Sequence, residues 1–349
     1  NTPEVPMDYY SQYDRPDDLD YAYPPGAYGV MSWWDYGHWI TVMGHRIPYA
    51  NPFQEGPRPA SAYLQATNET RANLILEALP ALSDSPSQVR FMSNSELRET
   101  TSTMDSQAAN ENGRYVVIDD QMAGGKFPAI TQWAGPDTDA YFQNGQYQFQ
   151  GRTVSLPQTS QRYDQTMLSK LYYRDASGLS HYRLVHEVDQ YSMIGGYIRG
   201  QQVQTLTSIS PSGWNWEAAG PIASQIEGSR GQIVSLGQGT GQYVYNSRVE
   251  SRVKTYERVE GATLTGTVPG AQNGTPVVAY VQLQTHTGRS FTYIQQTLTG
   301  PGGSFEMTVP YATDGSVGVA EGGTNSSVRA TGEYTIQAGT AGTPAATGS

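Results

Sequence analysis

The 349-residue sequence contains no cysteine. Disulfides and thiolate metal sites are therefore excluded, and the fold must rest on packing. Lysine is scarce as well, since only Lys126, Lys170 and Lys254 occur, and the formal net charge is −11. Such an acidic surface has no basic stripe to neutralise phosphates, which argues against nucleic acid as a partner. The same composition indicates a salt-rich habitat.

The sequence also lacks any run of about 20 apolar residues, the length needed to span a bilayer. It does not open with the basic and apolar segments of a signal peptide. Because it begins with Asn1 rather than Met, we expect a fragment or a processed product. What it does contain is 25 tyrosines and 6 tryptophans, whose large apolar area with polar tips suits half-buried positions.

Strand-like and helix-like patterns alternate between residues 29 and 260 and predict a mixed α/β core. Residues 1–28 are rich in Pro, Tyr and Asp without a helical or alternating period, and we expect an extended lead-in following a membrane region. An alternating segment with Asn144-Gly145 as its expected hairpin turn predicts a small β-rich insertion at about 134–160.

The composition and pattern of the sequence change after Gly261. Short Thr/Val/Tyr segments separated by turn pairs such as Asn273-Gly274 predict a peripheral antiparallel β-sandwich over 261–335. Small polar residues at 336–349 predict a disordered tail. The expected fold class is thus a mixed α/β core with a small β insertion, followed by an antiparallel β-sandwich-like domain.

Several local elements of the core can be predicted. Gly29–Trp33 and Arg114–Asp119 have the composition of short buried strands, and Val89–Met92 is expected to form another. His38–Met43 and Asn68–Leu79 are expected to be helical, the second with Asn68 as its N-cap.

Common enzyme signatures are missing from the sequence. There is no HExxH, GxSxG or P-loop motif, and the five histidines have no metal-ligand spacing. We therefore assign no catalytic residue and no metal ligand within this chain.

The first chemically distinctive cluster is WWDYG at residues 33–37. Trp33, Trp34 and Asp35 follow a predicted buried strand, at the sheet edge where open α/β folds place ligands. The alternative is that both tryptophans belong to the core and that Asp35 caps the next helix.

The second cluster is DxxMxxxKxxxI, beginning at Asp119. Met122, Lys126 and Ile130 are four residues apart, so a continuous helix would align them in one stripe. The alternative is an ordinary amphipathic helix with a single basic residue. Two glycines and a proline within the segment weaken the prediction of a helix.

Taken together, the two clusters resemble the paired signature of the archaeal, in particular haloarchaeal, oligosaccharyltransferase catalytic subunits. Further likeness lies in SWWDYGHWITVMGHRIPYANPFQEG from Ser32 to Gly56 and in YRLVHE from Tyr182 to Glu187. The resemblance covers about residues 1–260 well and the predicted sandwich loosely.

The resemblance implies that the first motif binds the Ser or Thr at position +2 of an Asn-x-Ser/Thr acceptor sequon. A hydroxyl offers one donor and two acceptor lone pairs, an indole N–H only donates, and a carboxylate only accepts. Ile130 would contact the threonine methyl, a contact worth up to about 0.8 kcal/mol. The implied substrate-binding residues are Trp33, Trp34, Asp35 and Ile130, and those of the second motif are Asp119, Met122 and Lys126.

The resemblance further implies a membrane-bound glycosyltransferase that moves an oligosaccharide from a dolichol-linked carrier to the asparagine of an acceptor polypeptide. This domain would face the extracellular side of the cell membrane and would be monomeric. A divalent metal, Mn or Mg, would be held by carboxylates in the membrane half, outside this chain. The isolated chain is therefore expected to be inactive.

Two other classes of protein stay open at this point. A cell-surface carbohydrate-binding or S-layer-type structural module would stack sugar rings on Trp33 and Trp34 without catalysis. A secreted glycosidase would need two carboxylates roughly 5–10 Å apart. The Trp-Trp-Asp set favours hydroxyl recognition, because stacking alone does not require the carboxylate.

Overall fold

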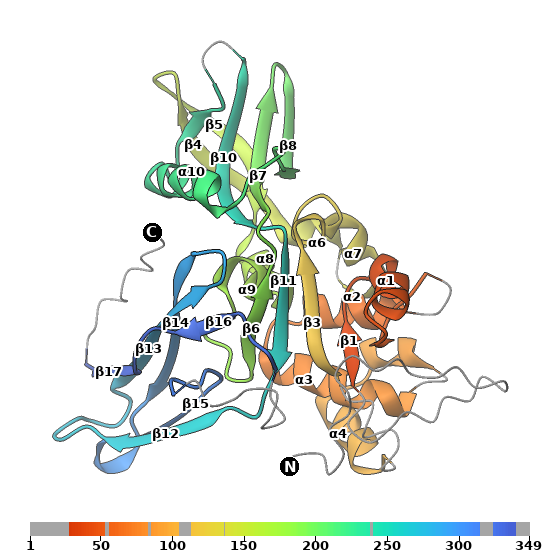
Figure 1. Cartoon of the computed structure of the whole chain (residues 1–349), viewed down its shortest axis with the longest axis vertical. Coiled ribbons are helices and arrows are strands. Elements are labelled where there is room, and N and C mark those ends of the chain that lie inside the picture. The colour runs from red at the N-terminus through yellow and green to blue at the C-terminus, as the bar shows by residue number, and fades with distance from the viewer. Residues whose placement is uncertain are drawn as a thin grey trace. The chain divides into compact units, whose positions relative to one another are not determined.

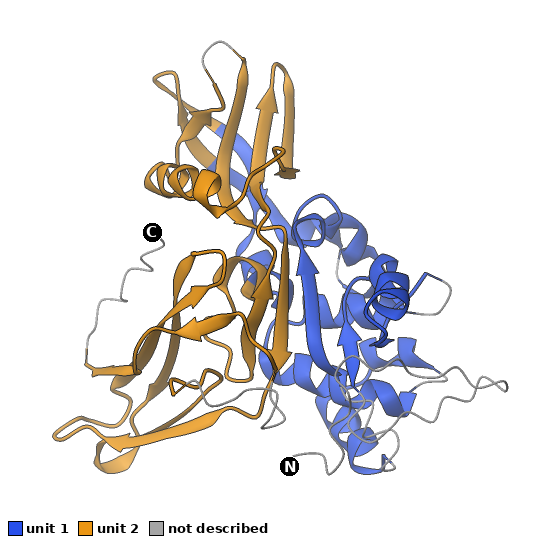
Figure 2. Ribbon diagram, viewed as in Figure 1, with its two compact units in different colours: residues 1–145, 155–169 blue, residues 146–154, 170–349 orange. Residues whose placement is uncertain are grey.

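The computed structural model divides the chain into two compact units, residues 1–145 with 155–169 and residues 146–154 with 170–349 (Figure 2). Apart from Tyr28, the expected lead-in lies outside the described residues, as does the expected tail from residue 340. The structure describes residues 28–52, 56–82, 85–104, 113–135, 137–237, 240–314 and 324–339.

The first unit contains three parallel strands, β1 Gly29–Met31, β2 Ile47–Pro48 and β3 Gly113–Asp119, of which β1 and β3 are labelled in Figure 1. β1 is central, because it pairs with β2 on one side and with β3 on the other. All three residues of β1 are buried. Parallel strands need long crossover connections, and helices fill the connection between β2 and β3. This confirms the predicted α/β character of the core.

Capping side chains fix the starts of two of these helices. Asn68 Oδ1 accepts a hydrogen bond of 2.8 Å from the backbone N–H of Arg71, as the sequence predicted. Ser93 and Glu96 form a reciprocal capping box at the start of the next long helix. The helices of this part of the chain are η1 Trp34–Tyr36, α1 Gly37–Val42, α2 Pro57–Gln65, α3 Glu69–Ala78, η2 Leu79–Leu82, η3 Pro86–Arg90, α4 Asn94–Ser102, α6 Asp120–Ala123, α7 Phe127–Ala134, η4 Thr138–Tyr141, α8 Gln161–Gln165 and α9 Met167–Arg174.

The strand predicted at Val89–Met92 is wrong. Residues Pro86–Arg90 form the 3-10 helix η3, with the proline in its first turn. Val89 is buried, whereas 76% of Phe91 is exposed, so the apolar residues do not share one face of a strand. Proline sets the backbone for a helical turn, and no sheet partner outweighs that local preference.

The predicted β insertion is a hairpin, but its turn was misplaced. β4 Phe142–Phe149 pairs with β5 Arg152–Thr159, and the turn residues Gln150 and Gly151 both have positive φ, of 50° and 76°. Gly145 lies within β4 instead. A Cβ on Gly145 would come within 2.6 Å of the Gln158 side chain on the paired strand, so this glycine allows a close approach.

In the second unit, β6 Tyr182–Glu187 pairs antiparallel with β11 Val253–Arg258. Four further strands form an antiparallel sheet in the order β8-β7-β10-β9. Helix α10 Trp216–Gly228 packs on this sheet through Ala219 and Ile226 (Figure 1). The four strands are β7 Tyr191–Arg199, β8 Gln202–Ile209, β9 Ile233–Ser235 and β10 Gln242–Ser251.

The strands after Gly261 are antiparallel, as predicted. β12 pairs with β15, while β13 pairs with β14, β16 and β17. Burial alternates along β13, as expected for strands with one face on a core. β17 includes residues 336–338, where the sequence predicted a disordered tail. The elements are β12 Ala262–Thr267, β13 Pro276–Thr285, β14 Ser290–Leu298, η5 Pro301–Gly303, β15 Ser304–Val309, β16 Val328–Ala330 and β17 Thr335–Ala338.

A buried network of charges lies within the second unit. Arg289 forms ion pairs with Asp175 at 2.8 Å and with Glu187 at 2.6 Å. Lys254 pairs with Asp175 at 2.8 Å and with Glu250 at 2.6 Å. The network joins β6, β10 and β11 to the β13–β14 connection, and so it ties the C-terminal strands to the rest of this unit.

Candidate functional site

The two tryptophans of the first motif differ in exposure. Trp33 follows β1 and is only 3% exposed, whereas Trp34 is half-buried in the 3-10 turn η1. Their ring centroids lie 6.3 Å apart at an interplanar angle of 75°, an edge-to-face arrangement. Trp33 therefore supports the motif from the core side, and Trp34 has the more accessible indole.

Asp35 does not cap a helix. The N-cap of α1 is Tyr36, and no side chain caps this terminus. Instead, Asp35 Oδ2 pairs with Nζ of Lys126 at 2.5 Å, and both side chains are 33% exposed. The helix-cap alternative for Asp35 is therefore wrong, and residues of the two sequence motifs lie in direct contact.

Tyr36 extends this contact into a chain of hydrogen bonds. Lys126 Nζ donates to the Tyr36 hydroxyl at 2.9 Å, and this hydroxyl donates to Asp119 Oδ2. Asp119 Oδ1 accepts from the backbone N–H of Met122 at 2.7 Å and caps α6. Tyr36 was not among the residues predicted for the site, although its place beside Asp35 in the motif was a usable signal.

The electrostatics of this chain keep the Tyr36 hydroxyl a donor. Burial and the negative charge of Asp119 raise the pKa of Tyr36 above its ordinary range, so the phenol stays protonated. Burial also raises the pKa of Asp119, although the hydrogen bonds from Tyr36 and Met122 oppose that rise. Tyr36 and Asp119 thus form a fixed support behind the Asp35–Lys126 pair.

The second motif does not form one continuous helix. α6 ends at Ala123, Gly124 adopts non-helical angles, and α7 begins at Phe127. The glycine pair permits this break, and the proline early in α7 starts a new helix. As a result, Lys126 points to Asp35, whereas Met122 and Ile130 are fully buried.

Ile130 has no exposed surface with which to touch a ligand. Its carbonyl accepts hydrogen bonds from Ser61 Oγ at 2.6 Å and from Gln65 Nε2 at 3.4 Å, both on α2. Met122 is likewise buried, with its sulfur 3.9 Å from Ser32 Oγ. In this conformation, the expected contact of Ile130 with a threonine methyl would require the neighbouring side chains to move.

One polar atom at the site is unsatisfied. Asp35 Oδ1 is buried and, within the described structure, has no hydrogen-bond partner. An unpaired buried polar group costs about 1–3 kcal/mol, so a donor that reached this oxygen would be favoured. Because the atom is almost completely buried, a ligand hydroxyl reaches it only if a neighbouring side chain moves aside.

Family models and curated relatives match this chain. An AglB core domain model matches residues 1–82, and a model of the archaeal glycosylation protein B long peripheral domain matches residues 261–347. The dolichyl-monophosphooligosaccharide–protein glycotransferase AglB of Haloferax volcanii is 33% identical over 94% of this chain. The chain is homologous to the archaeal AglB oligosaccharyltransferases.

Solved structures agree with this relationship. The Archaeoglobus fulgidus oligosaccharyltransferase, crystallised with Zn and sulfate, matches 92% of this chain at a TM-score of 0.59 and 26% identity. A crystal structure of that organism's enzyme tethered to an acceptor peptide with the NVT sequon matches 94% of this chain, at a TM-score of 0.60 and 25% identity. This chain covers 39% and 38% of those two chains and 33% of the Haloferax AglB.

Two further properties of the described residues bear on the AglB relationship. In the part of the chain that the structure describes, no three His, Cys, Asp or Glu side chains are grouped to hold a metal ion. These residues therefore do not fit a divalent-metal site. None of the described helices is long and apolar enough to cross a membrane.

Gly37 sets the position of α1 beside the Asp35 site, and we predict that Gly37→Ala is disruptive. A Cβ at this position would lie 2.2 Å from the Ala50 carbonyl oxygen and 2.4 Å from Cβ of Asn51. The backbone must shift to accommodate it, so we expect a loss of about 1–3 kcal/mol in thermal or chemical unfolding. Exposed Gly125 is the matched control, because a Cβ added there would have no atom within 4 Å. Equal losses for Gly37→Ala and Gly125→Ala would refute the prediction.

Proposed function

We propose that this chain is the acceptor-recognising part of an oligosaccharyltransferase that transfers an oligosaccharide from a dolichol-linked carrier to asparagine in Asn-x-Ser/Thr sequons. The observation that supports this most directly is Asp35, held by Lys126 through one oxygen while the other lacks a partner within the described structure. The +2 hydroxyl of the sequon would donate to Asp35, and the Trp34 indole N–H would donate to the hydroxyl oxygen.

The remaining residues of the proposed site support Asp35 and Trp34 without contacting the hydroxyl themselves. Trp33 packs edge-on against Trp34, and Ile130 lies in the core beneath α2. Tyr36 and Asp119 fix the Lys126 ammonium that holds Asp35. Such a site would discriminate against residues without a hydroxyl, because its buried polar groups would be left unpaired.

The rest of the reaction requires groups that the described residues do not supply. We propose that a divalent metal, Mn²⁺ or Mg²⁺, takes part and is bound elsewhere in the full-length enzyme, since a relative was crystallised with Zn. In that enzyme the chain would face the extracellular side of the cell membrane, and the enzyme would be a monomer. The isolated chain would be inactive.

The alternative of a carbohydrate-binding surface module has less support. A stacking platform needs two accessible indole faces, but Trp33 is 3% exposed. The relatives carry glycotransferase and oligosaccharyltransferase names, which also favour the transferase proposal over a secreted glycosidase.

The test is a pair of acceptor peptides, Asn-x-Thr and Asn-x-Val, offered to a full-length enzyme that carries this chain. Valine has nearly the shape of threonine but no hydroxyl, so it leaves Asp35 unpaired. We expect transfer to fall by about tenfold or more, because each lost hydrogen bond to a buried partner costs about 1–3 kcal/mol. Equal kcat/KM for the two peptides would show that no group of the enzyme recognises the hydroxyl.

A further inference from the structure

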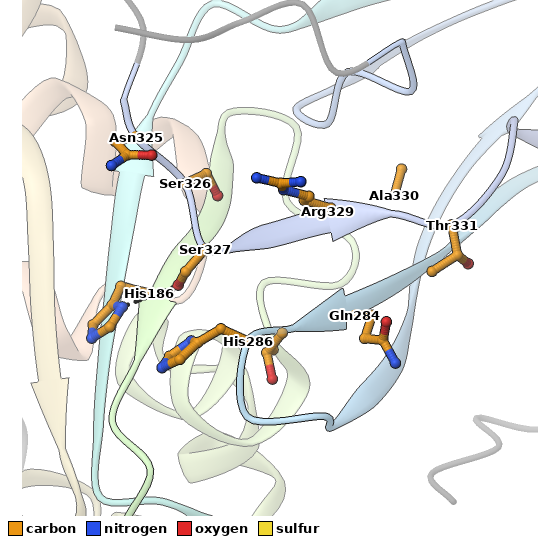
Figure 3. A pocket seen from close by; sticks show the side chains of 10 residues that line it. His186, Gln284, His286, Asn325, Ser326, Ser327, Arg329, Ala330 and Thr331 are labelled. Atoms are coloured by element: carbon orange, nitrogen blue, oxygen red, sulfur yellow. Dashed lines mark hydrogen bonds between the residues drawn. The ribbon is translucent and has the colours of Figure 1, made fainter.

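A second polar site lies in the other unit, at the edge of the β13–β16 sheet. Arg329 of β16 stands directly opposite Gln284 of β13, so both side chains project to the same face. Ser327 and His286 lie just outside these two strands, Ser327 before β16 and His286 after β13, and both line the same cavity. His186 of β6 borders it, and Figure 3 shows these side chains around one cavity.

The cavity has a volume of 670 Å³. A single inorganic anion would leave most of that space empty, since one water molecule occupies about 30 Å³ and typical ligand pockets measure about 300–1,000 Å³. Side-chain amides and hydroxyls line the cavity, including Asn325, Gln284 and Ser327. Such groups pair with the hydroxyls of a polyhydroxylated ligand.

The charged groups around the cavity favour an anion. Arg329 is exposed and, within the described part of the chain, forms no ion pair or hydrogen bond through its side chain. None of the described residues that line the cavity is acidic, although the whole chain carries a net charge of −11. The nearby carboxylate of Glu187 is buried and already paired with Arg289. The guanidinium of Arg329 is therefore available for a bidentate contact with a carboxylate or a sulfate.

The two histidines add a proton-dependent contribution. Their rings stack with centroids 4.9 Å apart, and His186 Nδ1 lies 3.0 Å from Ser327 Oγ. When that hydroxyl donates its one hydrogen to the Val185 carbonyl, 3.1 Å away, it accepts from Nδ1–H in the matching tautomer of His186. Nε2 of a neutral His186 then carries the lone pair, and protonation there turns it into a second donor.

Protonation of His186 is unfavourable without a ligand. Desolvation of the ring and the adjacent His286 lower the pKa of His186, although Glu187 opposes this shift. Of the groups around the ring, Glu187 is paired with Arg289, while Arg329 carries its positive charge into the same cavity. A bound anion would add negative charge beside the ring, favour its protonation and so raise the pKa of His186.

We propose that this cavity binds an acidic sugar, with its anionic group at Arg329 and the two histidines and its hydroxyls at the amide and hydroxyl side chains. The proposal is independent of the acceptor site. Because the anion stabilises protonated His186, binding should be strong below the pKa of the free ring. It should weaken as the pH rises through the higher pKa of the bound form.

The experiment is a titration of this chain with D-glucuronate, D-glucose and sulfate at constant ionic strength, followed by calorimetry and by the histidine ring signals in NMR spectra. We expect saturable glucuronate binding that is tighter than binding of either other probe and that strengthens from pH 8 to pH 5.5. Equal binding of glucose would overturn the role of the charge. Equal binding of sulfate would overturn the role of the sugar, and no saturable binding of glucuronate would overturn the site.

Two variants and a control locate the binding. Arg329→Gln should weaken glucuronate binding by about tenfold or more, since it removes a charge-assisted pair. His186→Gln should remove the pH dependence. Arg199→Gln makes the same charge change at an exposed strand position of the same unit and should have no effect. Melting curves confirm that the variants are folded, and equal effects of Arg329→Gln and Arg199→Gln would overturn the proposal.

Discussion

In a full-length oligosaccharyltransferase that carries this chain, Asp35→Ala is expected to lower transfer to Asn-x-Thr and Asn-x-Ser peptides together. Both hydroxyls would donate to the same carboxylate, so the substitution removes a charge-assisted hydrogen bond of roughly 1.5–3 kcal/mol from both complexes. It also leaves Lys126 without its ion-pair partner. Because 1.4 kcal/mol corresponds to about a factor of ten, kcat/KM should fall by about tenfold to a few hundredfold.

The same substitution should have little effect on stability. Asp35 and Lys126 are each 33% exposed, and solvent screens a pair of that kind to roughly 0–1 kcal/mol. We therefore expect the melting temperature to stay within a few degrees of the wild type. Asp139 is the matched control, because it is an exposed aspartate of the same unit, and Asp139→Ala should change neither activity nor melting. A fully active Asp35→Ala enzyme, or one whose activity loss follows unfolding, would end the sequon-recognition hypothesis for this motif.

Ile130 illustrates how far the sequence could predict the site. A motif position occupied by isoleucine is equally compatible with a ligand contact and with the core, and only tertiary packing decides between them. The structure buries Ile130 completely. Ile130→Ala would therefore be expected to destabilise the fold by about 2–5 kcal/mol, and a change in Thr/Ser preference could not be separated from that loss.

Local signals of the sequence were reliable where neighbours in the chain determine the outcome. The N-cap at Asn68 and the buried strand before the second motif depend on adjacent residues, and both were predicted. The Lys126–Asp35 pair joins residues 91 positions apart, and no periodicity specifies it. Only the resemblance to a paired family signature indicated that the two motifs belong together.

The buried charge network could not be predicted for the same reason. Arg289 and Asp175 are 114 residues apart, and each looks like an ordinary surface charge in the sequence. In the fold, the Arg289 side chain is 7% exposed and that of Glu187 is fully buried. Such charges are stable in a protein interior only when each has a partner.

Arg289→Met is therefore expected to destabilise the second unit strongly. Methionine fills a similar volume but leaves Asp175 and Glu187 without the guanidinium that pairs with both. Removal of one partner from a buried ion pair costs about 3–5 kcal/mol, because a buried charge remains uncompensated. At about 2–4 °C per kcal/mol for a unit of this size, the melting temperature should fall by roughly 6–20 °C. The matched control is Arg230→Met, whose side chain is 70% exposed and pairs with Glu227, and which should cost no more than about 1 kcal/mol.

The loss caused by Arg289→Met should also depend on pH. Burial alone would raise the pKa values of Glu187 and Asp175, but the charge and hydrogen bonds of Arg289, together with the charge of Lys254, outweigh burial and lower both. Carboxyls with depressed pKa values stabilise the fold above their unfolded pKa of about 4, and this contribution is lost as the pH falls through the folded values. In the variant, burial dominates and the same pKa values rise, so protonation under acid relieves the unpaired charges. The difference in unfolding free energy between wild type and variant should therefore be largest near pH 7 and shrink towards pH 4. Urea unfolding at both pH values measures it, and an equal difference at the two would contradict the role assigned to Arg289.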